Sequence, residues 1–384
     1  MPATRTLIAC QTFALIAGIF FSLAVLAAVP AFAEPPVKPP AKPTASLAPE
    51  WNARFAGKDG WIGGDAIYSV KISDKRIAWF FGDTFVGTVK NGRRDGAAMV
   101  NNSVGILSGS GSDAKMTFHF GKKPNGKPGS FFTPPREPGF EWPLSGAMSG
   151  TKLVQTLVRI EATQSGGPFG FKMMDQSLVV IENPGEDPAA WKYSFVPLPF
   201  TTGNEKRERL WGSACVTVSD MTYIYGTEDR TRKLGTRQLL VARVPTSQMS
   251  DPKAWRFRSA EGWSPNAEDA VGLANGLATE LSVTPAPGGG YVAVYTENGI
   301  GDRIVGRFST EPDGPWSAPR LLYSCPEKAN SNIFTYAAKA HGWHDRPGEL
   351  LISYSTNGWK FATSIESDEV YRPRFITWTN IPSK

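Results

Sequence analysis

A short motif that occurs twice limits the folds open to this chain of 384 residues. Residues 187–193 read DPAAWKY, residues 251–257 read DPKAWRF 64 residues later, and a looser copy, DGPWSAPRLLY, covers 313–323. Each copy follows a run of residues typical of a β-strand, so each marks the last strand of a repeated unit. Units of about 50–65 residues with about four strands each predict the blades of a β-propeller.

The rest of the chain follows the same plan. Short apolar runs separated by Gly, Pro, Asn and Asp fill residues 51–384 and almost none has a helical period, which is typical of an all-β domain. A β-sandwich is the alternative, but it leaves the recurring D-P-x-A-W unexplained. We expect a five-bladed propeller of four-stranded antiparallel blades over roughly 61–122, 145–200, 210–264, 277–324 and 333–378.

The first 50 residues differ in composition from the predicted propeller. Residues 1–33 combine Arg5, a long apolar run and the A-x-A cleavage pattern Ala31-Phe32-Ala33, so they predict a secretory signal peptide. The run is also long enough to remain as a membrane anchor, which is the alternative. Residues 34–50 are rich in proline and predict an extended linker. After cleavage we expect a monomer, secreted or held in the periplasm or cell envelope, with no stable membrane insertion.

Charge and motifs exclude several classes of protein. The formal net charge is +6, but the basic residues are scattered in stretches such as KNGRR (90–94) and NEKRER (204–209) without interleaved aromatic residues, so we expect no nucleic-acid partner. The sequence has no G-x-S-x-G, P-loop, H-E-x-x-H or C-x-x-C motif. Two cysteines remain after signal cleavage, Cys215 and Cys325, and they form either a disulfide or two buried free thiols.

An aspartate inside an apolar segment is the first candidate for the functional site. The stretch WFFGDTFVG (79–87) reads as a strand, yet it contains Asp83, a carboxylate that is costly to bury. A tight hairpin centred near Asp74 pairs residues whose numbers add up to 148, which places Asp65 opposite Asp83. Like charges this close raise a pKa, which suits general acid–base catalysis. The alternative is that each aspartate caps a turn.

Further candidates lie near predicted strand ends in this unit and in later ones. Acids there would face the two aspartates across a central channel, amides suit sugar hydroxyls, and indole rings suit sugar faces. Each candidate also has a structural alternative, namely a surface turn, packing between blades or a hydrogen-bonded core position. The candidates are the acids Glu280, Glu228 and Glu297, the amides Asn101 and Asn102, the indoles Trp61 and Trp211, and the imidazole of His341.

Several segments together resemble a known family. The segments are GGDAIYSV, WFFGDTFVG, NNSVGI, GTED, ATELSV and YAAKAHG, and the resemblance covers nearly all of residues 51–384. They resemble the secreted bacterial propellers called domain of unknown function 4185 and its relative 5005, and some members of the former are endo-D-arabinanases. The resemblance implies a five-bladed propeller with acids in the central cleft, where Asp65, Asp83 and Glu280 match the family's acidic positions.

The arrangement is also similar, more distantly, to the five-bladed arabinanases and xylosidases. In these enzymes a histidine of the fifth blade lies beside a metal ion in the channel, and His341 would take that place in this sequence. The resemblance therefore makes Ca²⁺ a candidate ion, although we expect no cofactor to be required.

Together these observations predict a secreted glycoside hydrolase that acts on an arabinan-like or related polysaccharide or oligosaccharide. Asp65 is the expected base or nucleophile, and Asp83 the residue that orients it. Glu280 or Glu228 is the expected acid. The rival hypothesis is a non-catalytic glycan-binding or cell-envelope scaffolding propeller, which needs channel aromatics and amides but no acid with a raised pKa.

Overall fold

The computed structural model describes residues 44–379 apart from 136, 165–168, 205–206, 232 and 345. The chain divides into two units, Met1–Pro40 and Ala41–Lys384, and the fold below is that of the second. The predicted signal peptide at 1–33 and the first part of the predicted linker lie outside the described residues. Within the described residues, no helix is long and apolar enough to cross a membrane.

The second unit consists almost entirely of β-strands, which confirms the all-β prediction. Among the described residues the α-helices are α1 (Pro49–Arg54) and α2 (Phe361–Glu366), with six residues each. Short 3₁₀ helices connect several strands: η1 (Gly111–Asp113), η2 (Pro188–Ala190), η3 (Thr246–Gln248), η4 (Pro252–Ala254), η5 (Ala267–Asp269) and η6 (Pro326–Ala329).

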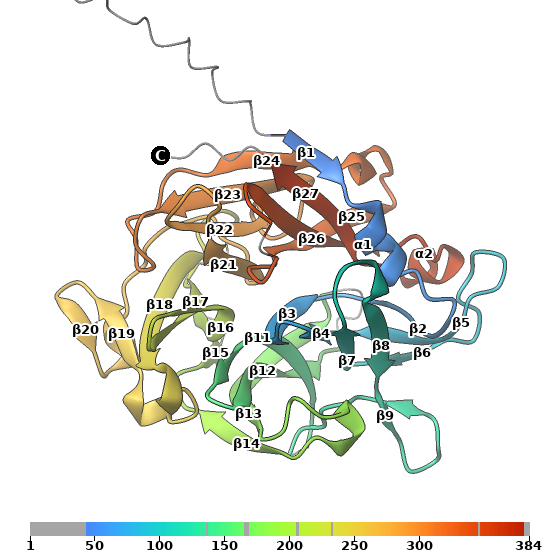
Figure 1. Cartoon of the computed structure of the whole chain (residues 1–384), viewed down its shortest axis with the longest axis horizontal. Helices are drawn as coiled ribbons and strands as arrows, with labels where there is room; N and C mark the ends of the chain where they lie inside the picture. Colours follow the sequence, from blue (N-terminus) through green and yellow to red (C-terminus); the bar gives the residue numbers. More distant parts are fainter. Residues whose placement is uncertain are drawn as a thin grey trace, which may run out of the picture. The chain divides into compact units, whose positions relative to one another are not determined.

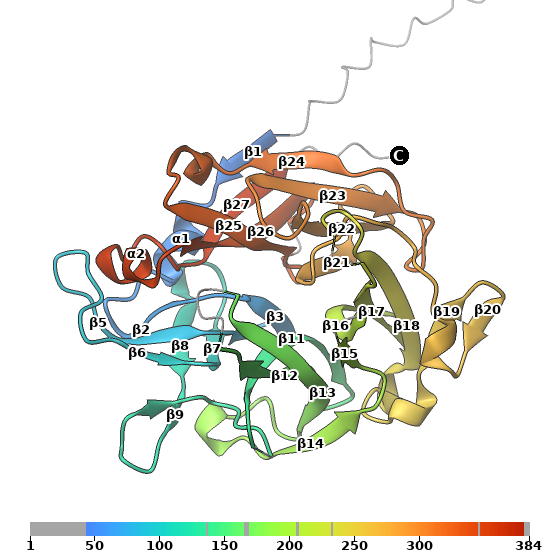
Figure 2. The ribbon, with the colours of Figure 1, turned by 180° about the vertical axis from the view of Figure 1, so that it is seen from behind.

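Five larger antiparallel sheets, which we number I to V, stand around a common centre (Figure 1), and the view from behind shows the same arrangement (Figure 2). Sheet I contains β3 (Tyr68–Ser73), β4 (Arg76–Phe81), β7 (Ser103–Ser108) and β8 (Lys115–His119). Sheet II contains β11 (Phe140–Ser149), β12 (Lys152–Ala162), β13 (Phe171–Ile181) and β14 (Tyr193–Leu198). Sheet III contains β15 (Thr202–Asn204), β16 (Arg207–Val218), β17 (Met221–Asp229), β18 (Gln238–Pro245), β19 (Arg256–Ser259) and β20 (Gly262–Ser264).

The remaining strands form sheets IV and V and two smaller sheets. Sheet IV contains β21 (Leu281–Pro285), β22 (Tyr291–Thr296), β23 (Arg303–Ser309) and β24 (Arg320–Ser324). Sheet V contains β25 (Ile333–Ala340), β26 (Glu349–Gly358), β27 (Arg374–Thr379) and β1 (Thr44–Leu47). The smaller sheets contain β2 (Asp59–Gly64), β5 (Thr84–Thr88) and β6 (Ala98–Val100), and β9 (Gly121–Lys122) with β10 (Pro128–Gly129).

One strand of each sheet lies next to a strand of the following sheet. β3 contacts β11, β11 contacts β16, β16 contacts β21, and β21 contacts β25. Sheets V and I also meet, because the hydroxyl of Ser69 in β3 is hydrogen-bonded at 2.7 Å to the ring of His341, which directly follows β25. The sheets therefore form a closed circuit.

The apolar core lies between neighbouring sheets around this circuit. Five clusters of buried residues each join two sheets, so burial of apolar surface holds the circuit together. The joining pairs include Phe80 with Leu157, Val180 with Trp211, Tyr225 with Val283, Val294 with Ile352, and Phe375 with Trp79.

The repeated D-P-x-A-W motif has the same structure in both copies. Asp187 and Asp251 cap the 3₁₀ helices η2 and η4 through their side chains. The following tryptophans, Trp191 and Trp255, are buried, and their indole N–H groups donate to backbone carbonyls at 3.1 and 3.0 Å. The strand after each motif pairs with the strand before it, β14 with β13 and β19 with β18. The motif therefore precedes β14, the outermost strand of sheet II, and β19, which in sheet III is followed by one further strand, β20, so the prediction that it marks the last strand holds only in sheet II.

The N-terminal boundary of the domain differs from the predicted one. Residues 44–50 were expected in the linker, but Thr44–Leu47 form β1, which pairs with β27 at the outer edge of sheet V. The segment TASLA between Pro43 and Pro49 lacks proline, so its N–H groups are available to the open edge of β27. The first strand of the domain thereby completes its last sheet.

The two cysteines do not form a disulfide. Cys215 lies in β16 and Cys325 precedes η6, and both are free. Cys325 is buried and Cys215 is partly buried, and burial raises the pKa of each thiol to about 12, so neither readily forms a reactive thiolate. Of the two alternatives left open by the sequence, the structure supports free thiols.

Candidate active site

Three strands of sheet I are joined through short bends to the three strands of the smaller sheet formed by β2, β5 and β6. β2 continues into β3 through Asp65, β4 continues into β5 through Asp83, and β6 continues into β7 through Asn101. Gly64 pairs with Thr84 on one side of the bend and Tyr68 pairs with Phe80 on the other, and both pairs of numbers add up to 148. The backbone N–H of Asp65 donates to the carbonyl of Asp83 at 3.3 Å. The predicted register is therefore confirmed.

The bend explains how an aspartate fits into an apolar segment. The sequence suggested that Asp83 lies within a single strand. The structure instead places it in the break between β4 and β5, which belong to different sheets. Ala66 and Ile67 have φ values of 65° and 55°, which non-glycine residues rarely adopt, and they turn the chain into β3. A Cβ atom at Gly82 would lie 2.6 Å from Oδ1 of Asp65, so a larger residue there would displace this carboxylate.

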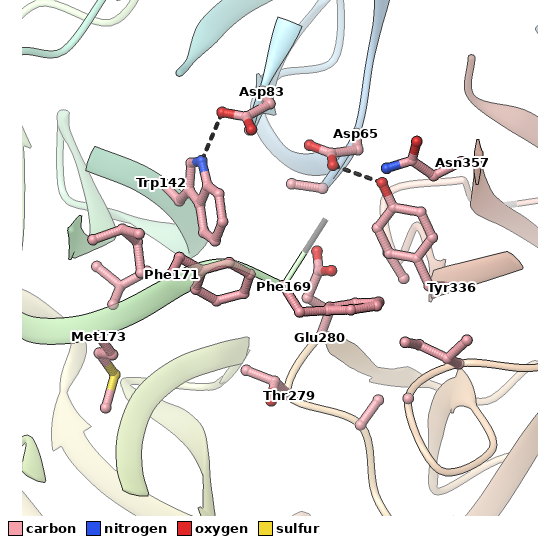
Figure 3. Close-up of a pocket in the computed structure, with 18 of the residues that line it drawn as sticks. Asp65, Asp83, Trp142, Phe169, Phe171, Met173, Thr279, Glu280, Tyr336 and Asn357 are labelled. Atoms are coloured by element: carbon pink, nitrogen blue, oxygen red, sulfur yellow. Dashed lines mark hydrogen bonds between the residues drawn. The ribbon is translucent and has the colours of Figure 1, made fainter. Parts of the chain in front are cut away.

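The bend faces a cavity of about 1260 Å³ that is lined by Asp65, Asp83 and Glu280. Figure 3 shows the two aspartates side by side, with Glu280 also pointing into the cavity. The hydroxyls of Tyr336 and Tyr371 both donate to Oδ2 of Asp65, at 2.6 and 2.9 Å. Three carboxylates from sheets I and IV thus meet in one cavity.

Asp83 is fixed by two N–H donors on a single oxygen. The indole of Trp142 in β11 donates to Oδ1 at 2.9 Å, and the amide of Asn101 donates to the same atom at 3.1 Å (Figure 3 shows the first). These two bonds orient the carboxylate through neighbouring strands on either side of it.

The environment favours the protonated form of both aspartates. Burial raises the pKa of Asp65 most, and the negative charges of Asp83 and Glu280 raise it further, against the lowering effect of the tyrosine hydroxyls. Burial also raises the pKa of Asp83, against the bonds from Trp142 and Asn101. The pair therefore holds a proton at a higher pH than an isolated carboxyl group, as a general acid requires.

A β-bulge in β25 directs two side chains to the carboxylates. Tyr336 and Lys339 are three positions apart, so in a regular strand they would point to opposite faces. The pairing of β25 with β26 shifts between them, and Ala337 has a φ of 58°. As a result Tyr336 reaches Asp65, while the buried ammonium of Lys339 pairs with Glu280 at 3.0 Å.

Strained backbone gathers around this cavity. Seven non-glycine residues of the described chain have a positive φ. Four of these line the cavity: Ala66, Asn298, Ala337 and Tyr371. Such conformations cost free energy and cluster at functional sites, so their distribution supports a functional role for the cavity.

Among the predicted amides, Asn101 contacts Asp83 but Asn102 serves the fold. Asn102 is fully buried. Its amide donates to the carbonyls of Phe132 and Glu141, both at 2.8 Å, and its carbonyl accepts the N–H of Phe132 at 2.7 Å. These bonds occupy the polar groups that a sugar would need, so we withdraw Asn102 as a substrate-binding candidate.

We expect Asn102→Ala to destabilise the protein by about 3 kcal/mol, because three buried backbone groups lose their partners. Urea unfolding measures the change. The control is Asn125→Ala, which removes one exposed bond to the N–H of Lys127 and should stay within about 0.5 kcal/mol of wild type. Equal effects of the two substitutions would contradict the structural role of Asn102.

The two predicted sugar-stacking tryptophans lie in the core. Trp61 is 2% exposed and stacks on Phe118 with a centroid distance of 4.3 Å, and its indole donates to Ser103. Trp211 is fully buried between sheets II and III. Neither indole is among the described residues that line the cavity, so both tryptophans pack in the core and do not contact a substrate there. Sequence pattern alone does not separate a packing indole from a stacking one.

His341 is also a core residue. Its two ring nitrogens are hydrogen-bonded to the hydroxyls of Ser69 and Ser353 at 2.7 and 2.9 Å, and its ring packs on Trp79. In the described part of the chain no group of three His, Cys, Asp or Glu residues is arranged to hold a metal ion. Serine hydroxyls thus occupy both ring nitrogens of His341, and the Ca²⁺ ion that the resemblance suggested stays a prediction.

We expect the His341 imidazole to remain neutral at pH 5. Burial lowers its pKa to about 3, with a further effect from the charge of Lys339. The ring nitrogen shifts in ¹⁵N NMR spectra report its charge between pH 8 and pH 4. A midpoint near the ordinary value of about 6.5 would mean that the ring is accessible to solvent, against the buried position described above.

The remaining predicted acids lie away from the aspartates. Glu228 is 1% exposed and is not among the described residues that line the cavity. Glu297 also lies outside that lining and pairs with Arg303 at 2.7 Å. We expected Glu228 to face the aspartates, and this expectation was wrong. The carboxylate of Glu228 instead forms ion pairs with three arginines, Arg207, Arg209 and Arg230.

Four residues of the site were not recognised in the sequence. Trp142, Tyr336, Lys339 and Tyr371 hold the carboxylates, and three of them come from sheet V or the loop before its last strand. Tyr336 and Lys339 fall within YAAKAHG, a segment that contributed to the family resemblance. That segment was the only signal that pointed to them.

The family described as Domain of unknown function (DUF5005) matches residues 49–381. A candidate hydrolase from Bacteroides ovatus has a similar solved structure, with a TM-score of 0.70 and 17% identity over 88% of this chain and 90% of that one. A GH43_1 enzyme from Xanthomonas citri reaches a TM-score of 0.47 at 13% identity, over 84% and 88% of the two chains. No curated protein matches. The first structural similarity shows a shared fold.

Proposed function

We propose that this chain, which belongs to the DUF5005 family, is a glycoside hydrolase that cleaves its substrate with Asp65, Asp83 and Glu280. The observation that carries the proposal is the convergence of these three carboxylates in one cavity. The raised pKa of Asp65 supplies a proton donor, and Glu280 supplies a separate anion. Glycoside hydrolysis uses two such carboxyl groups on opposite sides of the scissile bond.

In the proposed reaction Asp65 is the general acid. It transfers its proton to the glycosidic oxygen as the carbon–oxygen bond breaks, and the hydroxyls of Tyr336 and Tyr371 then stabilise the new carboxylate. Glu280, held by Lys339, accepts a proton from the attacking water or attacks the anomeric carbon itself. This division of roles is the reverse of the one expected from the sequence, because burial, together with the negative charges of Asp83 and Glu280, raises the pKa of Asp65 and favours its protonated form.

We also propose that sheets I to V are the blades of a five-bladed propeller. Three observations support this assignment: the contacts between strands of successive sheets, the apolar clusters between neighbouring sheets, and the contact between Ser69 and His341. The cavity then lies at the end of the central channel, where side chains from several blades converge. Such a position accounts for carboxylates from distant parts of the chain.

The substrate that we propose is an arabinan-like or related polysaccharide or oligosaccharide. This proposal rests on the family resemblance found in the sequence. Residues 1–33 support secretion or a place in the cell envelope, where such polymers occur, and we propose that the mature protein acts there as a monomer.

Incubation of the purified protein with arabinans, arabinogalactans and xylans tests the proposal by the release of reducing ends. We expect release from at least one polymer, and the anomer formed first reports whether Glu280 attacks directly or through water. Binding of a polymer without any release would support the rival function, a glycan-binding propeller. If the protein neither binds nor cleaves any of these polymers, both the hydrolase and the glycan-binding proposal are contradicted for these glycans.

A further inference from the structure

Exposed apolar side chains gather at the opening of the cavity. Phe169, Phe171 and Trp359 line the cavity and yet are 51%, 40% and 47% exposed, so they lie at its opening. Among the described residues nine large apolar side chains are exposed, and five of them line this cavity. We call these five the apolar mouth: Phe169, Phe171, Ile300, Trp359 and Phe361.

Two side chains of the apolar mouth, Phe169 and Trp359, form a connected aromatic surface together with Phe334. Phe169, which comes shortly before β13, lies 5.9 Å from Phe334 of β25 and 6.4 Å from Trp359, measured between ring centroids. Phe334 and Trp359 are themselves 4.5 Å apart. Side chains from sheets II and V thus meet over the opening, and Figure 3 shows Phe169 and Phe171 extending into the cavity near the carboxylates. A connected exposed apolar surface of this kind marks a binding site.

The chemistry of the apolar mouth differs from that of the cavity floor. Phe169, Phe171, Ile300 and Phe361 carry no side-chain atom that can form a hydrogen bond, whereas Tyr and Trp offer a polar edge to sugar hydroxyls. A sugar hydroxyl placed directly over one of these four side chains gains no hydrogen bond from it, although Lys172, Asn298 and Lys360 are also exposed in the cavity lining. An apolar group would instead bury its surface together with theirs.

On the basis of the proposed function, we infer that the substrate is a glycan that carries an apolar substituent. The scissile bond lies at Asp65 and Glu280, and an alkyl, acyl or aryl group lies in the apolar mouth. The cavity thus has a charged floor for the reaction and an apolar opening for recognition.

Calorimetric titration with a matched pair of glycosides tests this inference. The probes are methyl β-D-glucopyranoside and n-octyl β-D-glucopyranoside, the second kept below the concentration at which it forms micelles. Each buried methylene strengthens binding about fourfold, so burial of four or more of the octyl carbons gives about a 10²-fold difference. A third arm with 4-nitrophenyl β-D-glucopyranoside separates a preference for a flat ring from one for a chain. Octyl binding no tighter than methyl binding, including no binding of either, overturns the inference.

Variants locate the binding of the octyl group. Phe171→Ala and Trp359→Ala should each weaken octyl binding at least about 10-fold, because each removes apolar contact area. Leu321→Ala is the matched control, since Leu321 is 44% exposed on β24, outside the cavity lining, and its loss should leave octyl binding unchanged. Equal effects of all three substitutions would show nonspecific binding to exposed apolar residues and would overturn the inference.

The two proposals fail in different ways. Tight octyl binding that persists in Asp65→Asn, together with no hydrolysis of any glycan by wild type, would support the apolar mouth and contradict the glycosidase. Hydrolysis of unsubstituted arabinans without any preference for the octyl glycoside would contradict the apolar mouth and support the glycosidase. The binding measurement is therefore independent of turnover.

Discussion

Asp65→Asn should lower glycan hydrolysis at least about 10²-fold while the protein remains folded, because loss of a positioned acid or base costs about that factor. Asn is nearly isosteric with Asp and keeps an acceptor for Tyr336 and Tyr371, but it cannot transfer a proton. Initial rates of reducing-end release measure the loss. The control Asp74→Asn lies at the turn of the same hairpin and removes only an exposed pair with Lys71. Normal turnover in Asp65→Asn would contradict the role of Asp65.

The same substitution should stabilise the protein at neutral pH. The pKa of Asp65 is raised in the folded state, so the folded protein binds the proton more tightly than the unfolded chain does. Wild type therefore loses stability as pH rises from the ordinary pKa of about 3.9 through the raised value, and Asp65→Asn does not. Urea unfolding at several pH values should show a difference that grows with pH and vanishes below about pH 3. A variant less stable than wild type at pH 7 would contradict the raised pKa.

Glu280→Gln should have the same effect on activity but the opposite effect on stability. It removes the proposed base or nucleophile, so we expect hydrolysis to fall at least about 10²-fold. It also leaves the ammonium of Lys339, which is 2% exposed, without its anionic partner. Loss of one partner of a fully buried pair costs about 3–5 kcal/mol, and the partial exposure of Glu280 reduces the expected destabilisation to about 2 kcal/mol.

Two further variants separate the causes. Glu280→Gln combined with Lys339→Met removes both charges, so most of the lost stability should return while hydrolysis stays low. Glu297→Gln in the same sheet breaks only the more exposed pair with Arg303 and should change stability by less than about 1 kcal/mol, with normal hydrolysis. Unfolding in urea and reducing-end assays provide both readouts. A double variant as unstable as Glu280→Gln would contradict the explanation through Lys339.

Local pairing made part of the site predictable from the sequence. The hairpin between β3 and β4 turns within a few residues, so its position fixes the register, and the register places Asp65 beside Asp83. The D-P-x-A-W motif was informative for the same reason, since its Asp caps and its Trp packs within a single strand pair. Both predictions depended on contacts between residues that are near in sequence.

The residues of the site that could not be predicted from the sequence are those placed by contacts between distant parts of the chain. Glu228 and Glu280 looked alike as strand-end acids, but three arginines neutralise one and Lys339 holds the other in the cavity. Tyr336 and Tyr371 reach Asp65 only because sheet V lies beside sheet I. The bulge that turns Tyr336 and Lys339 to the same side leaves no recognisable pattern in the sequence.

The most direct test of the coupled carboxylates is a titration of the Asp65 carboxyl carbon by ¹³C NMR in wild type and in Asp83→Asn. We expect the midpoint in wild type to lie above the ordinary value of about 3.9 and to fall in the variant, because the charge of Asp83 contributes to the raised pKa. A wild-type midpoint at or below about 4 that does not move in Asp83→Asn would contradict the acid that the proposed glycosidase requires.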